Sequence, residues 1–92
     1  MNRPIIVVTG IGSITPLGLT TDAFWNNLIS GESGIGPITL CDPTPFPCQI
    51  AGEVKHFDAT DFISSKEARR MARFSQLAIV AAMEAVTSAE LK

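Results

Sequence analysis

Residues 66–89 form an alanine-rich run with neither glycine nor proline, and this run constrains the fold more than any other feature. Ser64, followed three residues later by Glu67, is the capping-box pattern that begins a helix. Apolar side chains then recur at helical spacing along one broad face: Met71, Phe74, Leu77, Ala78, Ala81, Ala82 and Ala85. The run therefore predicts one long helix over residues 66–89.

This predicted helix is apolar around most of its circumference. Between Arg73 and Glu90 its only charged residue is Glu84, and a second set of side chains widens the apolar surface: Ile79, Val80, Met83 and Val86. A helix that is apolar nearly all round is buried in a core. The remaining segments are too few and too short to cover it. We therefore expect the chain to be incomplete, or to bury this helix against another chain.

The N-terminal half predicts a strand and a helix joined by a glycine-rich segment. Residues 4–9 (PIIVVT) are apolar on both faces, which is typical of a strand buried on both sides of a sheet. Residues 10–18 are punctuated by glycine and proline and predict a loop. The residues 20–22 (TTD) can begin a helix, which Gly31 would end.

The middle of the chain predicts little regular structure. Residues 31–48 contain three glycines and four prolines, which indicates an irregular connection with at most short strands. Residues 49–54 predict a short strand, and residues 57–63 a single helical turn. With 92 residues, 46% of them hydrophobic and 17% charged, the chain is predicted to be globular and to form one small domain or part of a larger one.

A basic cluster lies at the start of the long predicted helix. Four of the seven Lys and Arg residues are Lys66, Arg69, Arg70 and Arg73. Their spacing of i, i+3, i+4 and i+7 places them on one stripe of a helix. One interpretation is a solvated face that aids solubility. The other is a docking site for an acidic partner. Positive charge at a helix N-terminus opposes the helix dipole, so the cluster is not explained by helix stability and a binding role would account for it.

Several function classes are disfavoured. A net charge of -2 argues against nucleic-acid binding. Gly10 and Gly12 follow a predicted strand, but the third glycine of a dinucleotide-binding loop is replaced by Thr15, with Pro16 after it. We interpret these glycines as structural, in a backbone that leaves a buried strand and turns sharply.

The cysteines and the histidine do not form a recognisable reactive site. The apolar run 5–8 is too short for a signal peptide, so we expect a cytoplasmic protein in which Cys41 and Cys48 are reduced thiols. Both lie in the proline-rich connection, and the single histidine, His56, is expected to be structural or exposed. Catalysis by either thiol is therefore disfavoured, and a zinc site is not predicted.

Four motifs in register resemble the β-ketoacyl-[acyl carrier protein] synthases. They are residues 7–18 (VVTGIGSITPLG), 24–28 (FWNNL) with 31–36 (GESGIG), 50–58 (IAGEVKHFD) and 66–74 (KEARRMARF). The resemblance covers essentially the whole chain and is strongest to the type II elongating enzymes called KAS II. One departure is Ala72, where those relatives commonly carry Asp.

The resemblance implies that residues 1–92 are an incomplete, N-terminal part of a β-ketoacyl synthase N-terminal domain. The expected fold is α/β and thiolase-like with α-β-α-β-α layers, in a protein that is usually dimeric. It implies decarboxylative Claisen condensation of an acyl thioester with malonyl-acyl carrier protein, without a cofactor or a metal. The family's nucleophilic cysteine and two histidines would lie beyond residue 92, so no catalytic residue is expected in this chain. The alternatives are a stand-alone carrier-binding module and an inactive homologue of the chain-length-factor kind.

The same resemblance assigns a role to the basic cluster. In KAS II-like enzymes the basic residues at the start of this helix meet the acidic face of the carrier protein. Lys66, Arg69 and Arg70 match those positions, and Arg73 is a weaker candidate. Acyl carrier protein is therefore the expected partner, and complementary charge would chiefly speed the encounter.

Overall fold

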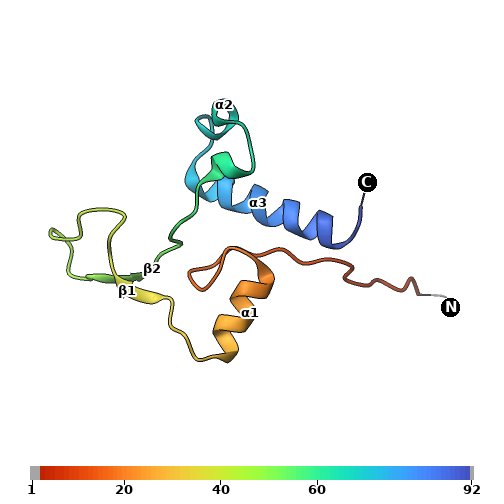
Figure 1. The fold of residues 1–92 in the computed structure, drawn as a ribbon, viewed down its shortest axis with the longest axis horizontal. Helices are drawn as coiled ribbons and strands as arrows, with labels where there is room; N and C mark the ends of the chain where they lie inside the picture. The colour runs from red at the N-terminus through yellow and green to blue at the C-terminus, as the bar shows by residue number, and fades with distance from the viewer. Residues whose placement is uncertain (1–2, 92) are drawn as a thin grey trace.

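The computed structural model describes residues 3–91, and its elements are arranged in an open rather than a compact form (Figure 1). In chain order they are α1 (Thr21–Ile29), β1 (Ile35–Pro37), β2 (Ile50–Gly52), the 3-10 helix η1 (Ala59–Asp61), α2 (Ser65–Ala68) and α3 (Arg73–Ser88). The radius of gyration is 16.6 Å, whereas a compact domain of this length has about 12 Å. The elements therefore do not collapse around one common core.

The N-terminal segment is extended but is not part of a sheet. Residues 3–14 form no strand, and the Ile5 and Ile6 side chains are 91% and 89% exposed. The prediction of a buried strand over residues 4–9 is therefore wrong for the described part of this chain. The physical reason is that a strand needs a neighbour for its backbone hydrogen bonds, and within residues 3–91 the only sheet is β1–β2.

The helix predicted after residues 20–22 is confirmed as α1. The hydroxyl of Thr20 accepts a hydrogen bond from the Ala23 amide at 3.1 Å, which caps the first turn. Gly31 follows the helix with φ of 79°, a left-handed conformation that glycine adopts at little cost. Local sequence signals thus set both ends of this element.

The middle of the chain forms one small hairpin. β1 and β2 pair antiparallel with Gly36 opposite Ala51, and the irregular residues between them carry both cysteines. The strand predicted over residues 49–54 is confirmed in its central part. The helical turn predicted within residues 57–63 is also confirmed, as η1, which Asp58 caps by accepting from the Thr60 amide at 2.9 Å.

The single helix predicted over residues 66–89 is wrong, because the structure divides it into α2 and α3. Ser64 caps α2 as expected by accepting from the Glu67 amide at 3.2 Å. The chain then leaves the helical conformation, and Ala72 takes φ of -68° and ψ of 158° ahead of α3. No glycine or proline marks this break. Its cause is tertiary, since side chains of the first turn of α3 bond to backbone carbonyls outside that helix.

Little of the apolar surface is buried within the described chain. The buried apolar residues are Ala59, Ala68 and Val80, while Phe74 at the start of α3 is 75% exposed. The expected burial of the long helix is therefore not reached by these residues alone. What buries the apolar surface of α3 stays a prediction.

Candidate functional site

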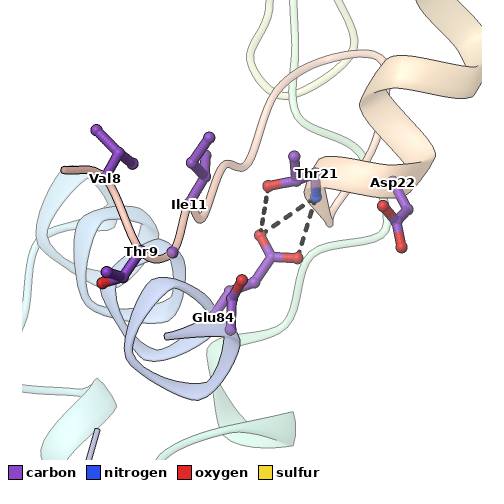
Figure 2. Close-up of a pocket in the computed structure, with 8 residues that line it drawn as sticks. Val8, Thr9, Ile11, Thr21, Asp22 and Glu84 are labelled. Carbon is purple, nitrogen blue, oxygen red and sulfur yellow. Dashed lines mark hydrogen bonds between the residues drawn. The ribbon is translucent and has the colours of Figure 1, made fainter. Parts of the chain in front are cut away.

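The Glu84 carboxylate joins α3 to two other segments of the chain, and Figure 2 shows its bonds to Thr21 at the start of α1. It lies on α3 and accepts hydrogen bonds from the Ser13 amide at 2.9 Å, the Thr21 amide at 3.0 Å and the Thr21 hydroxyl at 3.0 Å. Partial burial tends to raise the pKa of Glu84, but the hydrogen bonds from Ser13 and Thr21 outweigh it and hold this pKa below its ordinary value. The charged carboxylate thus fastens the glycine-rich loop and the start of α1 to α3.

A hollow of about 420 Å³ lies beside this carboxylate. Figure 2 shows Val8, Thr9 and Ile11 on the N-terminal segment at one side, with Thr21 and Asp22 at the start of α1 on the other. Its polar groups are hydroxyls and two carboxylates, and Glu84 is already occupied as an acceptor. We therefore interpret this region as scaffold. In the sequence, Glu84 is marked only by its isolation, as a lone charge in an apolar run.

Gly10 and Gly12 bring the N-terminal segment directly against α3. A Cβ atom at Gly12 would overlap the backbone of Ala81, and one at Gly10 would overlap the backbone of Ala85. Neither glycine has a positive φ, so close approach is what excludes a side chain here. The close approach supports a structural role for both glycines, but the prediction that they follow a buried strand is wrong, because residues 3–14 form no strand.

The basic cluster lies around α2, at the edge of the molecule that is uppermost in Figure 1. Lys66 is on α2, Arg69 is its C-cap, and Arg70 is in the turn that follows. All three are exposed, and the Arg69 Nε donates to the Ser65 carbonyl at 3.3 Å. Because the helix breaks before Arg73, the predicted single stripe of four cations is wrong, and the first three stand together on α2 and its turn.

Arg73 is exposed but its guanidinium is engaged by the fold. Its Nη2 donates to the Val54 carbonyl at 2.6 Å, and its Cζ lies 5.6 Å from the centre of the Phe57 ring. This side chain therefore connects the start of α3 to the segment after β2, which the spacing of charges could not reveal.

The described residues assemble no recognisable reactive or metal centre. Cys41 and Cys48 are exposed free thiols, and the Cys48 thiol donates to the Ile50 carbonyl at 3.1 Å. His56 is exposed, as expected, with φ of 62°. Within residues 3–91, no group of three metal-binding side chains comes together. None of the helices in this range is both long and apolar enough to cross a bilayer.

Comparison with known proteins identifies the family. Relatives include the 3-oxoacyl-[acyl-carrier-protein] synthase 2 of Synechocystis sp. (strain ATCC 27184 / PCC 6803 / Kazusa), 49% identical over 99% of this chain and 22% of the relative. The protein of the same name in Staphylococcus aureus (strain COL) is 48% identical over 94% of this chain and 21% of the relative. This chain therefore spans about a fifth of the length of these curated relatives.

A solved structure gives the same result for the fold. The structure described as "The ishigamide ketosynthase/chain length factor" aligns with a TM-score of 0.83 and 35% identity, over 94% of this chain and 21% of that chain. The family model described as "Beta-ketoacyl synthase, N-terminal domain" matches residues 3–92. The chain thus has a thiolase-like fold, and its residues 3–91 contain two strands, three α-helices and the 3-10 helix η1. It belongs to the β-ketoacyl synthase N-terminal domain family.

Proposed function

We propose that residues 1–92 are the N-terminal part of a 3-oxoacyl-[acyl carrier protein] synthase with the layered α-β-α-β-α fold. The protein would catalyse decarboxylative Claisen condensation of an acyl thioester with malonyl-acyl carrier protein, in fatty-acid or polyketide biosynthesis. The observation that carries this proposal is the 49% identity to a 3-oxoacyl-[acyl-carrier-protein] synthase 2 along nearly the whole chain. The segment contributes scaffold, and the protein acts as a cytoplasmic homodimer.

The segment also contributes part of the surface that docks acyl carrier protein. Lys66, Arg69 and Arg70 supply three exposed cations on one short element, in a chain whose net charge is -2. Arg73 adds a fourth positive charge beside them, with its guanidinium already engaged. A local cluster of one sign attracts a partner of the opposite sign and raises the association rate.

Binding measurements at two salt concentrations test the docking role. Lys66→Ala and Arg70→Ala in the natural protein should each weaken binding of purified acyl carrier protein by up to about five-fold, as for exposed ion pairs worth at most about 1 kcal/mol. The difference should shrink at high salt because the charges are screened. Arg3→Ala, at an exposed cation on the N-terminal segment, is the matched control and should bind as wild type. Wild-type binding by both cluster variants would refute docking.

A second candidate is an inactive homologue of the chain-length-factor kind. It is favoured by the likeness to a structure whose description includes a chain length factor. A condensation assay with acyl and malonyl thioesters of carrier protein separates the two candidates, because only the synthase forms a 3-oxoacyl product. The stand-alone binding module has no comparable observation in its favour.

A further inference from the structure

Arg73 differs from its basic neighbours in what its side chain touches. The guanidinium donates to the Val54 carbonyl at 2.6 Å and lies over the Phe57 ring, 5.6 Å from its centre. That ring in turn stacks on Phe62, with centroids 6.3 Å apart and planes 18° apart. Arg73, the first residue of α3, thus contacts the segment before η1 directly, and it is linked through the Phe57 ring to Phe62 after η1.

A second side chain of α3, that of Gln76, bonds directly to α2. The Gln76 Nε2 donates to the Ala68 carbonyl at 2.9 Å, which satisfies an acceptor at the end of α2. Ala68 and Ala59 are both buried, so α2 rests against η1. Four-residue helices have no stability of their own. The position of α2 therefore depends on this junction of α3, η1 and the residues before it.

The turn that carries the cations borders a hollow in the same junction. This hollow has a volume of about 460 Å³, and its lining includes Phe57, Met71, Arg69 and Arg73. The amides of Arg70 and Met71 bond to the Glu67 and Ala68 carbonyls at 3.0 and 3.1 Å, which closes the turn. Arg69 and Arg70 are exposed and Met71 is only partly buried, so little besides these hydrogen bonds and the contacts at the start of α3 holds the turn in place.

We infer that Arg73 is a positioning residue for carrier docking: it fixes α2 and its turn so that Lys66, Arg69 and Arg70 face the partner together, and it does not itself bind the carrier. This inference rests on the docking role proposed above. Arginine suits the task because its planar guanidinium can stack on a ring while donating a hydrogen bond. A lysine keeps the charge but replaces the plane with a compact ammonium group.

Two conservative exchanges separate positioning from direct contact. Lys66→Arg keeps the charge of a docking residue and should bind acyl carrier protein as the wild type does. Arg73→Lys also keeps its charge but loses the planar group, so it should raise the KM for acyl carrier protein at unchanged kcat, by less than the about five-fold expected of Arg73→Ala. Wild-type binding by Arg73→Lys together with weaker binding by Arg73→Ala would identify a direct charge contact and overturn the inference.

A second variant keeps the test independent of the folding of the Arg73 variants. Phe57→Leu removes the ring and no charge, so it should also raise KM, and combining it with Arg73→Ala should add little further loss. Additive losses would contradict a shared role. A fall in kcat at unchanged KM would indicate general loss of folded protein and also overturn the inference.

The effect of Lys66→Ala separates failure of the docking role from failure of the positioning role. If Lys66→Ala weakens carrier binding while Arg73→Lys and Phe57→Leu bind as wild type, only the positioning role fails. If Lys66→Ala has no effect, carrier docking by this cluster fails, and the positioning role fails with it. Amide exchange adds a direct readout, because the Arg70 and Met71 amides should exchange faster in Arg73→Lys while those of α1 do not change.

Discussion

Replacing Glu84 with alanine removes one acceptor that serves three donors on two other segments. The donors are the Ser13 amide, the Thr21 amide and the Thr21 hydroxyl, at 2.9, 3.0 and 3.0 Å. A hydrogen bond to a charged group contributes about 1.5–3 kcal/mol. These atoms are only partly buried, so water replaces some of the lost interactions. We therefore expect Glu84→Ala to lower the free energy of unfolding by about 2–3 kcal/mol rather than by the full sum.

The expected loss is measurable by urea unfolding and by amide exchange of the natural protein. Glu84→Gln should lose roughly half as much as Glu84→Ala, since a neutral acceptor forms hydrogen bonds of about half the strength. The Ser13 and Thr21 amides should exchange about ten-fold faster for each ~1.4 kcal/mol of local stability lost. Glu32→Gln is the matched control, because Glu32 is exposed on the loop after α1.

Two outcomes would contradict a stabilising role of the Glu84 carboxylate. If Glu84→Ala and Glu32→Gln unfold at the same urea concentration, the carboxylate does not stabilise the junction. If stability falls but the Ser13 and Thr21 amides keep wild-type exchange, the loss comes from elsewhere in α3. Either outcome would remove Glu84 as the link between α3 and the N-terminal segment.

Two further predictions concern close packing and acid. Gly12→Ala should destabilise the protein by about 1–3 kcal/mol in urea unfolding, because its Cβ would overlap the Ala81 backbone. Gly36 has open space around it, so Gly36→Ala should stay within about 0.5 kcal/mol of the wild type. Equal effects of the two exchanges would contradict the close approach of Gly12 to α3. The folded-state pKa of Glu84 is lowered, so its contribution to stability is complete above the unfolded pKa and is lost as pH falls through the folded one. In an acid titration of unfolding stability, the wild type should therefore lose more stability than Glu84→Gln does, and equal losses would contradict the prediction.

Sequence reasoning succeeded where the determinants of structure are local. The Thr20 cap, the left-handed Gly31 and the Asp58 cap act within a few residues of the elements they bound, so α1 and η1 were predictable. The basic cluster was visible in the sequence, because four of the seven Lys and Arg residues lie in one short stretch. The contacts of the Arg73 guanidinium with Val54 and Phe57, which set it apart from the other three cations, could not be predicted in this way.

The failures all involve partners distant in the sequence. Residues 4–9 have the composition of a buried strand, but pairing requires a neighbouring strand, and periodicity cannot supply one. The break between α2 and α3 likewise contains no helix-breaking residue. It follows contacts of Arg73 with Val54 and of Gln76 with Ala68, which are 19 and 8 residues apart. Tertiary contacts here override a strong helical preference.

One face of α3 shows how these distant relations could have been anticipated. Ala81, Glu84 and Ala85 lie at i, i+3 and i+4, so they share a face of the helix. The alanines leave room for the backbone at Gly10 and Gly12, and the carboxylate accepts from amides of the segments that follow. In a helix surrounded only by apolar side chains, a lone carboxylate between small residues would lack hydrogen-bond donors. An acidic residue flanked by alanines in an apolar helix therefore indicates a polypeptide backbone lying against that face.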